Sequence, residues 1–199
     1  MPKVLNRFSQ LRSADNVLYE LRDRDGNVKP IFQENAFAKA MLKAGTLSPL
    51  WINRWYAPLI MPFLGTYASF KVIGNLITNA GFAGAAGRLM GSGAPAAFTY
   101  IAVGTGTTAA AVTDTTLQTE TATSGLSRVS GTVSLVTTTV TNDTAQVTNT
   151  FSVTGTVAVT ESGVLNAASV GTLLCHQVFT AINVINGDSL AITWKVKQS

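Results

Sequence analysis

Apolar and polar residues alternate with a period of two through much of the C-terminal half of the chain. Between residues 145 and 154, Ala, Val, Phe and Val fall on one face and Gln, Thr and Ser on the other. Residues 190–196 repeat the pattern, with Leu, Ile, Trp and Val on the inward face. Successive side chains of a strand point to opposite faces, so the alternation predicts sheets with one buried face. We predict strands at 98–103, 125–140, 145–156, 157–159, 173–179 and 190–196, with 125–140 and 145–156 forming a hairpin.

The first seventy residues have a different pattern. Residues 17–22 and 28–33 flank an Asp-Gly pair that favours a tight turn, which predicts a hairpin. Residues 36–44 are helix formers that follow a capping Asn35 and precede Gly45, and Lys39 and Lys43 share one face of this predicted helix. From 46 to 67 the periodicity is lost, and three prolines indicate an extended path.

A second helix is predicted from the cap at Thr78 or Asn79 to about Met90, after a strand at 70–73. Glycine recurs in it at 81, 84 and 87, a spacing that creates a narrow face for the close approach of another backbone. The predicted fold is mainly β. It is an antiparallel β-sandwich-like domain with one helix (71–199), preceded by an extended N-terminal arm (1–70) with a hairpin and a short helix.

The apolar but aperiodic segment 46–67 allows two interpretations. It either packs irregularly on its own domain or docks as an arm on a neighbouring subunit, where aromatic anchors are typical of interface cores. The second interpretation gives candidate partner-interface residues, which are Trp51, Trp55, Tyr56, Leu59, Ile60, Phe63 and Leu64.

Composition favours an assembly. Only 12% of the 199 residues are charged, and 23 of the last 99 are Thr, so strand edges lack the Lys and Pro residues that normally protect them. We therefore expect a homo-oligomer that covers these edges. Residues 1–100 hold eleven Lys or Arg and five Asp or Glu, against three and five in 101–199. The basic residues are scattered, so we expect no specific binding of nucleic acid.

The N-terminus has no apolar stretch of the secretory kind, and the apolar runs are too short and too interrupted to span a bilayer. We expect synthesis in a cytoplasm and no membrane span.

Residues able to carry chemistry are few. His176, the only histidine, adjoins Cys175, the only cysteine, but neighbours on a strand face opposite ways and cannot form a nucleophilic pair. The run Gly104 to Thr108 lacks the Lys of a phosphate-binding loop and the third Gly of a dinucleotide fingerprint. The acids of this half, Glu161 among them, fall in turn-like contexts. We expect no catalytic, cofactor-binding or metal-binding residues, and no cofactor.

Four motifs occur in a fixed order: Leu76 to Gly81, Tyr100 to Thr108, Asp114 with Leu117 and Glu120, and Val159 to Asn166. Together they resemble structural proteins of tailed bacteriophages, in particular the N-terminal attachment region of tail-collar fibres. The chain also resembles short phage virion proteins that end in a Gly-Asp-Ser-Leu-x-x-x-Trp strand, as residues 187–194 do. The resemblance covers about residues 70–199.

The resemblance implies an antiparallel β domain without enzymatic activity that is localised in the virion. It implies an accessory or adaptor subunit of the tail or fibre base, attached through the N-terminal arm to other virion proteins of the tail or baseplate. No repetitive shaft follows Ser199, so we do not expect a complete host-recognition fibre. A capsid decoration or cement protein, bound to the major capsid protein, is the alternative. A polysaccharide depolymerase and a membrane-active protein that uses residues 50–64 are less favoured.

Overall fold

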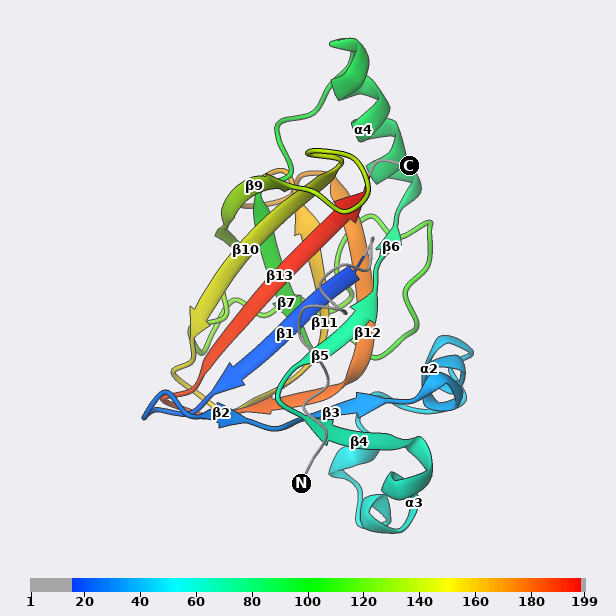
Figure 1. Ribbon diagram of the computed structural model, residues 1–199, viewed down its shortest axis with the longest axis vertical. Helices are drawn as coiled ribbons and strands as arrows, with labels where there is room; N and C mark the ends of the chain where they lie inside the picture. Colours follow the sequence, from blue (N-terminus) through cyan, green and yellow to red (C-terminus); the bar gives the residue numbers. More distant parts are fainter. Residues whose placement is uncertain (1–15, 198–199) are drawn as a thin grey trace.

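Two antiparallel sheets pack face to face in the computed structural model, which describes residues 16–197 (Figure 1). The first sheet has the order β2 (Val28–Lys29), β1 (Asn16–Arg22), β13 (Ser189–Lys197), β10 (Thr144–Ser152) and β9 (Thr132–Val136), and β5 (Lys71–Gly74) also pairs with β1. The second has the order β6 (Leu76–Ile77), β12 (Leu173–Val184), β11 (Val157–Leu165), β7 (Tyr100–Gly104) and β8 (Val129–Ser130). The predicted β-sandwich-like fold is confirmed.

The main core lies between the two sheets, where the alternating apolar positions meet. Trp194 and Ile192 of β13 and Val159 of β11 all belong to this core, and all three side chains are fully buried. Tyr19 of β1 stacks at a tilt on Phe179 of β12, with ring centroids 4.6 Å apart. The expected hairpin is formed by β9 and β10, paired from Val136↔Thr144 to Thr132↔Thr148.

The N-terminal hairpin belongs to this sandwich. β1 pairs with β13 along its whole length, from Asn16↔Lys195 to Arg22↔Ser189. Its inward side chains, among them Tyr19, are part of the main core. The division at residue 70 therefore does not separate an arm from a domain within the described chain, because β1 supplies an interior strand that the sheet requires.

A smaller layer is built on the outer end of β12 from residues 31–68. The strands β3 (Ile31–Glu34) and β4 (Gly65–Ala68) pair with each other. Between them lie α2 (Ala36–Lys43), the 3-10 helix η1 (Trp51–Asn53) and α3 (Ala57–Leu64). α2 begins at the predicted residue, because the Asn35 side chain accepts the Ala38 N–H, and it ends at Lys43, one residue before the predicted end and just ahead of Gly45, which has a φ of 70°. A second core cluster joins these elements.

The extended path predicted for 46–67 is wrong, because residues 57–64 form α3 despite their prolines. Pro58 lies in the first turn of α3, where a backbone N–H has no partner within the helix, so its ring costs no hydrogen bond. Pro62 lies inside the helix and removes one hydrogen bond. The helix is only eight residues long, so the loss is confined to its last turn.

The predicted glycine-rich helix is present as α4 (Asn79–Met90), with Thr78 as its cap. A Cβ placed on Gly81 would lie 2.3 Å from the Leu174 carbonyl oxygen, and one on Gly87 would lie 3.0 Å from that of Ser92. The glycine face therefore allows β12 and the returning chain to approach closely, as predicted. α4 and α3 project at opposite ends of the longest axis of the molecule (Figure 1).

Candidate functional site

Three large apolar side chains are exposed on α3 and in the turn before it. Leu59 and Phe63 are four residues apart within the helix and share one side of it, and Trp55 lies in the turn two residues before the helix begins. They expose 86%, 69% and 75% of their surface. We call these three residues the α3 surface. Contiguous exposed apolar side chains of this kind mark sites of protein interaction.

The remaining candidate interface residues are less accessible. Trp51 and Leu64 are buried in the second core cluster, so their prediction as partner-contacting residues is wrong. Tyr56 and Ile60 are half-buried. Of the two interpretations of segment 46–67, packing on its own domain is correct for the buried residues of the segment. The α3 surface is the part of the segment that remains accessible to a partner.

Trp51 anchors the segment to the sandwich. Its ring packs edge-on against Phe32 at a centroid distance of 5.1 Å, and its Nε1–H donates to Thr180 Oγ1 over 3.0 Å. The indole was recognised in the sequence as an anchor, but its partner is β12 of the same chain. A buried Trp satisfied in this way fixes its segment rigidly.

The C-terminal end of α3 and the segment before η1 are tied to neighbouring elements. The side-chain amide of Asn35 donates to the Phe63 carbonyl over 2.8 Å, next to the backbone bond from Asn35 N–H to Leu64 O. Before the helix, the Ala181 N–H of β12 donates to the Pro49 carbonyl over 2.9 Å. The α3 surface is therefore presented on a rigid base.

The surface offers hydrophobic contact rather than chemistry. Its three members carry no ionisable group, and the edge-on pair of Trp55 and Tyr56, 5.8 Å between centroids, adds a second aromatic ring beside it. Fully burying one such side chain contributes about 1.5–3 kcal/mol, so three together contribute about 4.5–9 kcal/mol to docking before the entropic cost of association is subtracted.

A second constellation lies inside the protein, around Glu161 of β11. Oε1 of this carboxylate accepts the backbone N–H groups of Gly106 and Thr119 at 2.9 and 2.7 Å. Oε2 accepts the Gln118 N–H at 2.9 Å and lies 3.0 Å from His176 Nε2. The other ring nitrogen of His176 lies 2.7 Å from Asp114 Oδ2. We call these residues the Glu161 network.

The electrostatics of the network favour charged side chains. Burial would lower the pKa of His176, but hydrogen bonds to Glu161 and Asp114 outweigh it and raise that pKa. Burial would raise the pKa of Glu161, but bonds from His176 and from three backbone N–H groups lower it. A protonated ring donates from both nitrogens and therefore ties β12 to the loop at Asp114 and to β11.

The network is better explained by structure than by catalysis. The side chains of His176 and Glu161 are completely buried. A phosphate-binding loop offers its backbone N–H groups to a ligand, whereas here the Gly106 N–H is donated to Glu161. Cys175 faces the main core, so the predicted separation from His176 is confirmed. Among residues 16–197, no group of three or more His, Cys, Asp or Glu is arranged to hold a metal ion.

Glu161 lies within β11 and not in the turn-like context predicted for it. Its signal was an acid in the middle of an otherwise uncharged strand, with a Gly-rich loop earlier in the chain to supply backbone donors. Three of the four motifs that carry the phage resemblance meet here, since Gly106, Asp114 and Glu161 belong to one hydrogen-bonded network.

Comparison of the chain with models of protein families, with curated proteins and with solved structures finds no match. Within residues 16–197, no helix has the length and apolar character needed to cross a bilayer.

Proposed function

We propose that this protein is a non-enzymatic structural protein of a tailed-bacteriophage virion. It serves as an accessory or adaptor subunit of the tail or fibre base and attaches to its neighbours through the α3 surface. The observation that carries the proposal is the exposure of Trp55, Leu59 and Phe63 on a rigid base. An isolated chain gains nothing by leaving these side chains in water, whereas a subunit of a particle buries them in a neighbour.

Two further features support the proposal. Three of the four motifs that resemble phage collar proteins contribute residues to the Glu161 network. Its described hydrogen bonds join one segment of the chain to another, as expected of a structural protein. The edge strand β9 exposes Val133 and Leu135 by 56% and 62%, which suits a homo-oligomer that covers this edge.

The test is incorporation into particles. A variant with serine at 55, 59 and 63 is supplied in infected cells in place of the wild-type chain, and purified particles are analysed by quantitative mass spectrometry. Because the three side chains are exposed, the melting temperature of the variant stays within about 2 °C of wild type. Incorporation falls at least about tenfold, the equivalent of 1.4 kcal/mol of lost contact.

The matched control removes apolar residues of similar size from the opposite end of the molecule. Phe82, Leu89 and Met90 of α4 are exposed by 58%, 79% and 82%, and their triple serine variant incorporates normally if attachment uses α3. Normal incorporation of the α3 variant refutes the attachment site, and absence of the wild-type chain from particles refutes the virion role. A few to a dozen copies per particle support the tail, whereas hundreds of copies favour the alternative of a capsid decoration or cement protein.

A further inference from the structure

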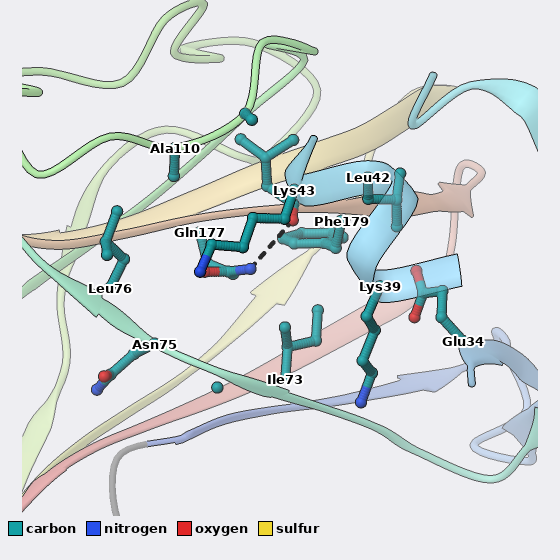
Figure 2. A pocket seen from close by; sticks show the side chains of 13 residues that line it. Glu34, Lys39, Leu42, Lys43, Ile73, Asn75, Leu76, Ala110, Gln177 and Phe179 are labelled. Atoms are coloured by element: carbon teal, nitrogen blue, oxygen red, sulfur yellow. Dashed lines mark hydrogen bonds between the residues drawn. The ribbon is translucent and has the colours of Figure 1, made fainter. Parts of the chain in front are cut away.

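A small cleft opens between α2, the segment from β5 to β6, residues 109–110 and β12 (Figure 2). Its volume is about 260 Å³. It lies on the side of α2 that carries Lys39 and Lys43, which share a face as the sequence predicted. Figure 2 shows the two lysine side chains leaving α2 in different directions over the cleft, with Gln177 and Phe179 on its β12 wall.

The lysines give the cleft an unbalanced positive charge. Within residues 16–197, no carboxylate lies within ion-pair distance of Lys39 or Lys43, and Lys39 Nζ makes only a 3.4 Å contact to the Val72 carbonyl. Among the described residues, Glu34 is the one acid that lines the cleft, and its charge is already balanced by Lys71 at 2.6 Å. Two ammonium groups at the rim therefore attract carboxylates.

Glu34 contributes an unused acceptor. Its Oε1 accepts the Lys71 ammonium and the Thr180 N–H, at 2.6 and 2.9 Å. Its Oε2 is buried and has no hydrogen-bond partner among the described residues, although Glu34 lines the cleft. A buried carboxylate oxygen without a donor is costly, so this atom indicates a ligand that brings an N–H or O–H group.

The floor of the cleft is apolar. Ile73 and Phe179 are buried at its base, and Leu76 and Ala110 line its side. The volume lies below the range of about 300–1,000 Å³ that is usual for sites of small-molecule ligands. It suits a single apolar side chain that anchors a longer partner outside the cleft.

We propose that this cleft recognises an acidic peptide segment of a partner protein. One apolar side chain of the segment enters between Ile73 and Phe179, its flanking carboxylates pair with the two lysines of α2, and a backbone N–H donates to Glu34 Oε2. Identifying the partner as another virion protein rests on the proposed function. The chemistry of recognition does not, because it follows from the cleft alone.

The test titrates the ¹⁵N-labelled full-length protein with the peptide acetyl-Gly-Glu-Leu-Glu-Gly-amide and follows its amide spectrum. We expect saturable shifts at residues 73–76 and 177–179. A peptide with Gln in place of both Glu binds at least about 5-fold more weakly, since two ion pairs are lost. A peptide with N-methyl-leucine cannot donate to Glu34 and binds about tenfold more weakly, because hydrogen bonds to charged groups are the strong ones. No binding at 5 mM peptide, or equal binding of all three peptides, overturns the proposal.

Matched variants of the protein separate the site from general charge. Lys39→Gln with Lys43→Gln reduces affinity for the acidic peptide at least about 5-fold. Arg24→Gln with Arg54→Gln removes the same net charge from exposed positions and leaves affinity unchanged. If both pairs reduce binding equally, attraction is nonspecific and the cleft is not the site.

Particle incorporation distinguishes this proposal from the previous one. If the peptide binds the cleft but the wild-type chain is absent from particles, the virion role fails and the cleft proposal stands. If the chain incorporates and the peptide does not bind, the cleft proposal fails and the virion role stands.

Discussion

Replacing Glu161 by Gln tests whether the Glu161 network holds the sandwich and its loop together. The substitution keeps the size of the side chain and one carbonyl oxygen, but it replaces the other oxygen by an NH₂ group. Four donors converge on the native carboxylate, from Gly106, Thr119, Gln118 and His176. In the variant, two of them face another donor.

The expected cost follows from the two lost bonds. Hydrogen bonds to a charged group contribute about 1.5–3 kcal/mol each, so Glu161→Gln lowers the free energy of unfolding by about 3–6 kcal/mol. Domains of this size lose about 2–4 °C of melting temperature per kcal/mol, which gives a fall of about 6–24 °C. Total stability is typically about 5–15 kcal/mol, so the variant remains folded at room temperature in all but the worst case.

Thermal unfolding monitored by circular dichroism at pH 6 measures the effect, and hydrogen exchange locates it. The amides that face the new NH₂ group lose protection, which are either Gly106 and Thr119 or Gln118 alone, because only their acceptor is lost. Asp25→Asn is the control, since it removes one negative charge from an exposed turn and changes stability by less than about 0.5 kcal/mol. A melting temperature of Glu161→Gln within 2 °C of wild type would refute the reasoning.

Three further predictions follow from buried contacts. The stabilisation from Glu161, whose pKa is lowered from 4.5, is lost as pH falls below 4.5, and the stabilisation from His176, whose pKa is raised from 6.5, is lost as pH rises above 6.5. Urea unfolding across pH therefore shows the free energy of unfolding of the wild type declining on both sides of this range, and His176→Asn removes the decline on the alkaline side. Trp51→Ala costs about 3–5 kcal/mol in urea unfolding, whereas Trp55→Ala costs under about 0.5 kcal/mol, and equal costs would contradict the burial of only the first ring. Gly81→Ala lowers the unfolding free energy by about 1–3 kcal/mol although Ala favours helix, because its Cβ meets a β12 carbonyl; a stabilised variant would exclude that contact.

Local patterns were enough to predict most elements of the fold. The period of two gave the strands of the sandwich, and α2 and α4 begin at the caps that Asn35 and Thr78 provide. These signals are local because they depend on backbone geometry and on side chains within a few residues. α3 was missed because its prolines were taken to exclude a helix wherever they occur. Pro58 in fact lies in the first turn, where proline is tolerated.

The candidate site was predicted only in part, because burial depends on partners distant in sequence. Trp51 and Trp55 are equally apolar neighbours, and only the packing of Trp51 on Phe32 and Thr180 distinguishes them. The Glu161 network was missed for the same reason, since its donors come from a loop more than 40 residues earlier. The periodicity of apolar residues along the chain does not indicate which distant loop will donate hydrogen bonds to a buried carboxylate.

The pairing of β1 with β13 sets the order of events during synthesis. β1 comprises residues 16–22, and its partner comprises residues 189–197, so the first sheet stays incomplete until β13 has left the ribosome. Pairings of such long sequence separation form slowly and late. A chain that stops before β13 lacks the strand that joins β1 to β10, so the first sheet is left in two parts and the sandwich cannot close.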